Sequence, residues 1–125
     1  MAQYGKPDYW ENRYIKDPEP FDWYQKYSEN PHLKGTLNKH IPKTASILIP
    51  GCGSSRLSEE MVADGYTGGI ANIDISRTVI DLMAARAKGR DGMTCAFFTI
   101  AKGISPPSFF LTTAHFHCLA TPLYK

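Results

Sequence analysis

Cysteine is scarce in this sequence. The chain has three cysteines, an odd number, and they stand far apart, at Cys52, Cys95 and Cys118. Small secreted domains that depend on disulfides carry even and much denser sets of cysteines. The sequence is therefore not that of a disulfide scaffold, and we expect the protein in a reducing compartment.

The sequence also has no apolar run long enough to cross a bilayer, no internal repeat and no apolar leader after Met1. We therefore expect a cytoplasmic protein without a membrane partner. The formal net charge is only +2, which gives no reason to expect nucleic acid as a partner. With 42% hydrophobic and 21% charged residues in 125, the composition is that of one globular domain with a modest core.

A strand followed by a glycine loop is the most informative stretch of the chain. Three bulky aliphatic residues at 47–49 predict a strand that is buried on both faces. Gly51 and Gly53 follow this strand, and glycine lets the backbone turn sharply and come close to a ligand. The stretch therefore predicts a strand–loop–helix unit with a ligand at the loop.

Local signals predict where the helix of this unit begins and ends. Ser54 or Ser55 can cap its N-terminus, and acids at 59 and 60 lie where the positive end of the helix dipole favours them. Gly65 fits the left-handed position that commonly follows the last turn of a helix. The helix is thus expected between the loop and Gly65.

An acidic residue, Asp74, closes the next predicted strand, residues 69–75, and comes 23 residues after Gly51. A helix separates the two strands, so they run parallel and their carboxyl ends meet at one edge of the sheet. A carboxylate at that edge can accept both hydroxyl groups of a ribose. Loop and acid together predict a nucleoside-binding crevice, and an ordinary strand–helix turn is the plainer interpretation.

The loop lacks the features that bind a diphosphate. Arg56 takes the place of the third glycine of the dinucleotide fingerprint, and the Walker pattern is absent. S-adenosylmethionine (SAM) has no diphosphate, so it is favoured over NAD as the ligand. An NAD-binding oxidoreductase stays as an alternative.

Capping residues and apolar spacing predict the remaining elements. These are a helix over 8–14 with Asp8 as its cap and Glu11 in a capping box, a helix from Asn30-Pro31 to Pro42 that covers the first strand, a helix capped by Ser76, and a third strand at 93–98. The predicted fold class is α/β, with the β-α-β-α-β half of a doubly wound sheet after N-terminal helices.

Several segments resemble one known family. Residues 47–58, 64–66 and 72–76 are similar to motif I and the following acidic motif of class I SAM-dependent methyltransferases. Within that class, these segments and the lead-in at 8–14 and 21–24 resemble the group that modifies lysines or the N-terminus of elongation factor 1-alpha. The resemblance covers residues 8–95.

The resemblance implies a Rossmann-like sheet, SAM as the cofactor and elongation factor 1-alpha as the protein substrate. The resemblance also implies that aromatic faces of the lead-in cover the ligand near its sulfonium cation. The alternative is that these aromatic residues only pack against the rest of the domain. Catalytic residues and oligomeric state cannot be named, and no metal site is indicated. The cofactor-binding residues that loop, acid and resemblance indicate are Trp10, Tyr14, Trp23, Gly51, Gly53, Asp74 and Ile75.

The last part of the chain departs from the family pattern. From 96 to 125 there is no acidic residue, and the family's next acidic motif and fourth strand are missing. We interpret residues 1–95 as the lead-in helices and the SAM-binding half of a methyltransferase domain, and 96–125 as an atypical tail. The chain is then either a methyltransferase or a truncated, non-catalytic form that binds SAM weakly or partners the full-length enzyme.

Overall fold

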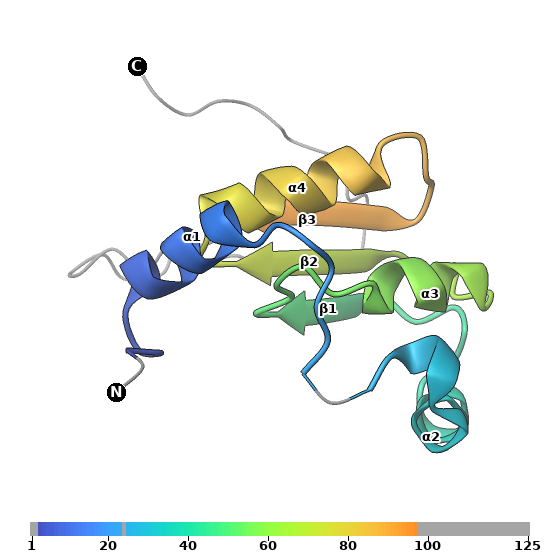
Figure 1. The fold of residues 1–125 in the computed structure, drawn as a ribbon. Coiled ribbons are helices and arrows are strands. Elements are labelled where there is room, and N and C mark those ends of the chain that lie inside the picture. Colours follow the sequence, from blue (N-terminus) through green and yellow to red (C-terminus); the bar gives the residue numbers. More distant parts are fainter. Residues whose placement is uncertain (1–2, 24, 98–125) are drawn as a thin grey trace, which may run out of the picture.

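A computed structural model describes residues 3–23 and 25–97 of the chain. They contain one parallel sheet of three strands in the order β1-β2-β3, with a helix between consecutive strands (Figure 1). The strands are β1 (Ile47–Pro50), β2 (Ile70–Asp74) and β3 (Met93–Phe97). The prediction of a parallel α/β unit is confirmed, while the atypical tail predicted at 96–125 lies outside the described residues from 98 onward.

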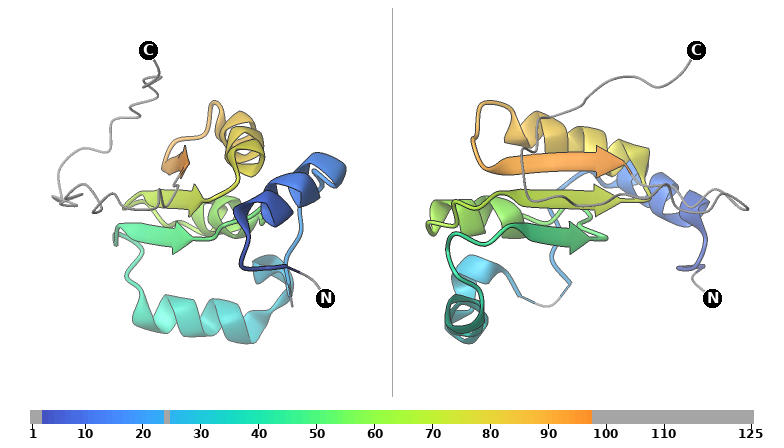
Figure 2. Two further views of the ribbon diagram at one scale, coloured as in Figure 1. Left: turned by 90° about the vertical axis from the view of Figure 1, so that its left-hand side faces the viewer. Right: turned by 180° about the vertical axis from the view of Figure 1, so that it is seen from behind.

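Three helices cover one face of the sheet. Figure 2 shows α1, α3 and α4 on the same side of the three strands. The first of them packs against α4, which in turn packs against β2 and β3. No helix in the described part of the chain is both long and apolar enough to cross a membrane. The helical elements are α1 (Pro7–Lys16), the 3-10 turn η1 (Tyr27–Glu29), α2 (Pro31–His40), α3 (Leu57–Ala63) and α4 (Arg77–Ala87).

The expectation that β1 is buried on both faces is wrong. Ile47 and Ile49 pack into the core, but Leu48 between them is 46% exposed. Side chains alternate along a strand, so Leu48 and its register partner Ala71 lie on the face opposite to α3 and α4. A continuous aliphatic run cannot tell a strand with one covered face from one that is buried on both.

The core beneath α1 and α4 consists of one apolar cluster. Its buried members are Tyr14, Cys52, Val79, Ile80 and Met83, with Trp10 and Ile49 packed against it. Full burial of an aliphatic or methionine side chain stabilises a fold by about 1.5–3 kcal/mol. The cluster joins the N-terminal helix, the glycine loop and α4, so it places the lead-in directly beside the loop.

A second apolar cluster lies between α3, β2 and the α2 segment. Tyr27, Met61, Tyr66 and Ile70 are its buried members. The apolar residues of α2, spaced four apart, pack against it and are Leu33, Leu37 and Ile41. The prediction that α2 is a structural element is therefore confirmed, and it covers this cluster, against which Ile47 and Ile49 of β1 also pack.

Several predicted caps are present in the structure. The Asn30 side chain accepts the backbone N–H of Leu33, and the Ser76 hydroxyl accepts that of Val79. Gly65 has φ 93° directly after the C-cap of α3, and its N–H and that of Tyr66 bond back into the last turn. This pair of bonds is the Schellman arrangement that glycine favours.

The predicted cap of α1 is wrong. The helix begins at Pro7, with Lys6 at the N-cap and no side-chain cap, and Asp8 lies in the first turn. Proline is well suited to the first helical position because its missing N–H would have no partner there. Glu11 does not close a capping box either, since its carboxylate contacts the start of α4.

The start of α3 also differs from the prediction. Arg56 occupies the N-cap, one residue after Ser55 and two after Ser54. The Ser55 hydroxyl still accepts the N–H of Leu57, at 3.0 Å, so it satisfies one helical donor from outside the helix. Both serines belong to the loop and form hydrogen bonds with the segment before α2, and the helix begins after them.

A cluster of ion pairs around the partly buried Asp64 joins α2 to the end of α3. Asp64 accepts the Tyr27 hydroxyl at 2.7 Å and forms ion pairs with Lys34 and Lys43 at 2.7 and 2.8 Å. Hydrogen bonds from Lys34, Lys43 and Tyr27 hold the pKa of Asp64 well below its usual range. Burial and the Asp64 carboxylate raise the pKa of Tyr27, so the tyrosine stays a neutral donor.

Candidate cofactor-binding site

The loop after β1 is built on two glycines in the left-handed region. Gly51 has φ 64° and Gly53 has φ 52°, a conformation that disfavours other residues by about 1–2 kcal/mol. A Cβ on Gly51 would meet nothing within 4 Å, whereas one on Gly53 would lie 2.6 Å from the Tyr14 hydroxyl oxygen. Gly53 is therefore required by its conformation and by the close approach of α1.

Asp74 at the end of β2 faces this loop. Its Oδ2 accepts the N–H of Gly53 at 2.9 Å, and its Oδ1 accepts the N–H of Ser76 at 2.9 Å. The residue is 7% exposed. An ionised carboxylate has about four lone-pair sites, so two backbone donors leave acceptor capacity on both oxygens. Each oxygen can take one further hydroxyl donor.

Tyr14 completes the group at the loop. Its ring is 8% exposed and stacks on Trp10 with the ring centroids 6.3 Å apart. Burial, and next the negative charge of Asp74, raise the pKa of Tyr14 to about 12. The phenol is therefore neutral at physiological pH, and its hydroxyl group lies beside Gly53.

The other predicted site residues lie farther out. Trp10 donates its indole N–H to the backbone oxygen of Tyr4 at 2.7 Å. Trp23 meets Trp10 edge to face, with centroids 6.3 Å apart, and is 61% exposed. Ile75 is half-buried and directly follows Asp74. The structure thus brings Tyr14, Gly53 and Asp74 together, with Trp10 one ring away and Trp23 at the surface.

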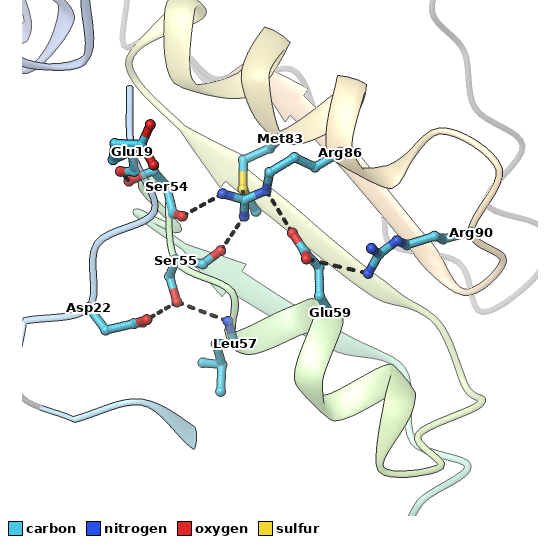
Figure 3. Close-up of polar contacts among 9 residues, drawn as sticks. All are labelled: Glu19, Asp22, Ser54, Ser55, Leu57, Glu59, Met83, Arg86 and Arg90. Carbon is cyan, nitrogen blue, oxygen red and sulfur yellow. Dashed lines mark hydrogen bonds and ion pairs between the residues drawn. The ribbon is translucent and has the colours of Figure 1, made fainter. Parts of the chain in front are cut away.

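Arg86 of α4 holds the glycine loop in place, and no motif in the sequence pointed to this role. Its two terminal nitrogens donate to the backbone oxygens of Ser54 and Ser55 at 2.8 and 2.7 Å (Figure 3). Its Nε donates to the Glu59 carboxylate of α3 at 2.7 Å. One planar guanidinium group therefore joins the loop, α3 and α4.

The segment before α2 holds the loop from the other side. The Ser54 hydroxyl donates to the backbone oxygen of Glu19 at 2.9 Å, and the Ser55 hydroxyl donates to the Asp22 carboxylate (Figure 3). No spacing rule links residues more than thirty positions apart, so these partners could not be found from sequence. The loop is thus fixed by three separate segments.

One hollow among the described residues lies beside this network and not over Asp74. It has a volume of about 790 Å³. Asp22, Arg56 and Glu60 are among its lining residues, whereas Gly51, Gly53 and Asp74 are not. Within residues 3–23 and 25–97, no group of three or more histidine, cysteine or acidic side chains could hold a metal ion.

Comparison with known proteins identifies relatives for most of the chain. No family model matches it. Over 89 residues, 70% of this chain, it is 40% identical to the eEF1A lysine and N-terminal methyltransferase of Bos taurus, and over 82 residues, 65% of the chain, 42% identical to that of Homo sapiens. Over 86 residues, 67% of the chain, it is 29% identical to EEF1A lysine methyltransferase 4 of Mus musculus.

The aligned part is a small share of those proteins. It spans 12% of the bovine and 11% of the human relative, and 32% of the mouse protein. Within that share the identity reaches 42%. By sequence, this part of the chain is similar to part of the proteins that are named eEF1A lysine and N-terminal methyltransferases.

Proposed function

We propose that this chain carries the SAM-binding part of a protein methyltransferase. The three parallel strands and their helices would then form the first half of a Rossmann-like class I methyltransferase sheet. One observation carries the proposal, which is the 2.9 Å hydrogen bond between the Asp74 carboxylate and the Gly53 N–H at the ends of neighbouring parallel strands. In parallel sheets, ligands bind at this edge.

The residues at this edge suit a ribose and a cationic cofactor. Asp74 keeps acceptor capacity on both carboxylate oxygens, which fits a pair of sugar hydroxyls. The space that a side chain on Gly51 would fill is open, so a ligand can approach the backbone there, whereas the Tyr14 hydroxyl already lies against Gly53. SAM, when bound, supplies an activated methyl group on a sulfonium. The rings of Tyr14 and Trp10 offer aromatic faces that favour such a cation.

The acceptor is proposed from the names of the relatives. These name eEF1A as the protein modified, at a lysine or at the N-terminus. Methyl transfer mainly requires alignment of donor and acceptor and exclusion of water. A lysine acceptor must also lose its proton, which desolvation near a cation favours. Cytoplasmic location and the division at residue 95 stay predictions.

A second candidate is a non-catalytic form that binds SAM weakly or associates with a longer enzyme. The described residues supply three strands, the first half of the proposed sheet, which favours weak binding because a second half would help to enclose the nucleoside. We expect a dissociation constant above about one micromolar. An NAD-binding oxidoreductase is disfavoured, since Arg56 occupies the place of the third glycine that a pyrophosphate fingerprint requires.

The experiment is a thermal melt with SAM, followed by calorimetry on two variants. At a SAM concentration of 100 times Kd, binding raises the free energy of unfolding by about 2.7 kcal/mol. Asp74→Asn should abolish the shift. Asp81→Asn, whose carboxylate pairs with Arg77 on the surface, should keep it. A melting temperature that rises with NADH and not with SAM would refute the proposal. A separate assay, transfer of labelled methyl groups from SAM to eEF1A, would distinguish the catalytic from the non-catalytic form.

A further inference from the structure

Glu11 of α1 reaches across the fold to the first residues of α4. Its Oε2 accepts the Ser76 hydroxyl at 2.6 Å. The backbone N–H of Thr78 lies 3.2 and 3.3 Å from its two carboxylate oxygens, and the Thr78 hydroxyl donates to Oε1. The partners are 65 and 67 positions away in the sequence. These contacts, together called the Glu11 clamp, hold α1 at the N-terminus of α4.

The clamp combines two favourable terms. Hydrogen bonds to an ionised carboxylate are about twice as strong as those between neutral groups. The N-terminus of α4 also carries a partial positive charge and backbone N–H groups without helical partners. Because the Glu11 carboxylate supplies both a negative charge and hydrogen-bond acceptors at this helix end, it is suited to fixing the position of α1.

The clamp is continuous with the proposed cofactor site. Ser76 donates its hydroxyl to Glu11 and its backbone N–H to Asp74 Oδ1. The other oxygen of Asp74 accepts the N–H of Gly53. A single path of hydrogen bonds therefore runs from Glu11 through Ser76 and Asp74 to the glycine loop.

The same helix carries the aromatic part of the site. Trp10 precedes Glu11, and Tyr14 follows it by one turn, on the side where α1 meets Gly53. Figure 1 shows α1 lying beside the start of α4. Releasing the carboxylate would loosen the helix that holds Tyr14 against the loop, even though Glu11 itself does not contact the loop.

We propose that Glu11 is a positioning residue of the SAM site, which holds α1 on α4 so that Tyr14 and Asp74 keep their places around Gly53. This inference rests on the proposed function. Loss of one charged acceptor should weaken SAM binding about tenfold. Glu11 touches no ligand in this account and acts through Ser76 and through α1.

The test compares Glu11→Gln with Asp8→Asn, an equivalent amide substitution at an exposed position of the same helix. Glu11→Gln should raise the Kd for SAM about tenfold, and Asp8→Asn should leave it within about twofold. Thr78→Val removes one donor of the clamp without altering α1, so it should act like Glu11→Gln and guards against a variant that fails to fold. Equal Kd values for Glu11→Gln and Asp8→Asn would overturn the proposal.

A double-mutant cycle separates positioning from a general loss of stability. With Tyr14→Phe already in place, Glu11→Gln should weaken SAM binding less than it does in the natural chain, because both changes act on one arrangement. If Glu11→Gln raises the Kd for SAM by the same factor with and without Tyr14→Phe, Glu11 does not act through Tyr14. That result would overturn this part of the inference.

Hydrogen exchange measured without SAM tests whether the Glu11 clamp holds α1, independently of cofactor binding. Glu11→Gln should raise the exchange rates of the α1 amides at least about tenfold and leave those of α2 unchanged. Unchanged α1 protection would overturn the clamp. If the natural chain fails to bind SAM, the proposed function fails and the role at the SAM site fails with it, while the exchange result still shows whether Glu11 holds α1.

Discussion

Replacing each glycine of the loop by alanine should separate backbone strain from contact with α1. Gly51→Ala meets open space, so it should lower the free energy of unfolding only by the cost of a left-handed residue, about 1–2 kcal/mol. Gly53→Ala carries the same strain and places a methyl group 2.6 Å from the Tyr14 hydroxyl oxygen. To restore ordinary contact, the two groups must move apart by about 0.8 Å.

In a packed site such crowding costs about 1–3 kcal/mol more. Gly53→Ala should therefore destabilise the chain by about 2–5 kcal/mol in total. Urea unfolding followed by circular dichroism measures the difference, provided that the slope with denaturant stays the same. Equal losses for Gly51→Ala and Gly53→Ala would refute the close approach of α1 to the loop.

Removing the hydroxyl supplies the control. In the double variant Gly53→Ala with Tyr14→Phe, the nearest remaining ring atom is 3.6 Å from the new methyl group, which is an ordinary contact. The double variant should thus recover to the level of Gly51→Ala. A double variant as unstable as Gly53→Ala alone would locate the cost in the backbone and not in the contact with Tyr14.

Three further outcomes are expected. Arg86→Met should lower the free energy of unfolding by about 3 kcal/mol, because it leaves the loop carbonyls without their donor and Glu59 with the longer 3.4 Å contact to Arg90. Arg90→Met on the exposed side should cost under about 0.5 kcal/mol in urea unfolding. Stability should fall as pH drops below about 4, because the pKa of Asp64 is lower in the folded than in the unfolded chain, and melts of Asp64→Asn should lack this part of the pH dependence. Trp23→Ala should change the melting temperature little, since the ring is 61% exposed, but should weaken SAM binding in calorimetry if the ring covers the ligand.

Signals that act within one or two turns were readable from the sequence. The caps at Asn30 and Ser76 and the left-handed Gly65 depend on neighbours a few residues away, and each is present. The alternation of strands with helices was sufficient to predict that Asp74 meets the glycine loop at one edge of the sheet. Local chemistry and topology rules determine these features, and no knowledge of distant contacts is needed.

Contacts between distant segments were missed, for a common physical reason. Glu11 has a local alternative, the capping box, and only the folded chain shows that the start of α4 takes its carboxylate instead. Arg86 fits a general preference for bases near helix ends, which says nothing about the loop carbonyls that it binds. The exposure of Leu48 depends on which face of the sheet is covered, and an aliphatic run contains no information on that.

The long separation between Glu11 and Thr78 has a consequence for synthesis of the chain. Helix α1 is made before α4, and Thr78, which binds Glu11, follows 67 positions later. At about 5–20 residues per second, the ribosome needs about 3–13 s to add them. Throughout that interval the aromatic rings of α1 cannot pack on α4, so they stay exposed on the nascent chain until α4 has been made.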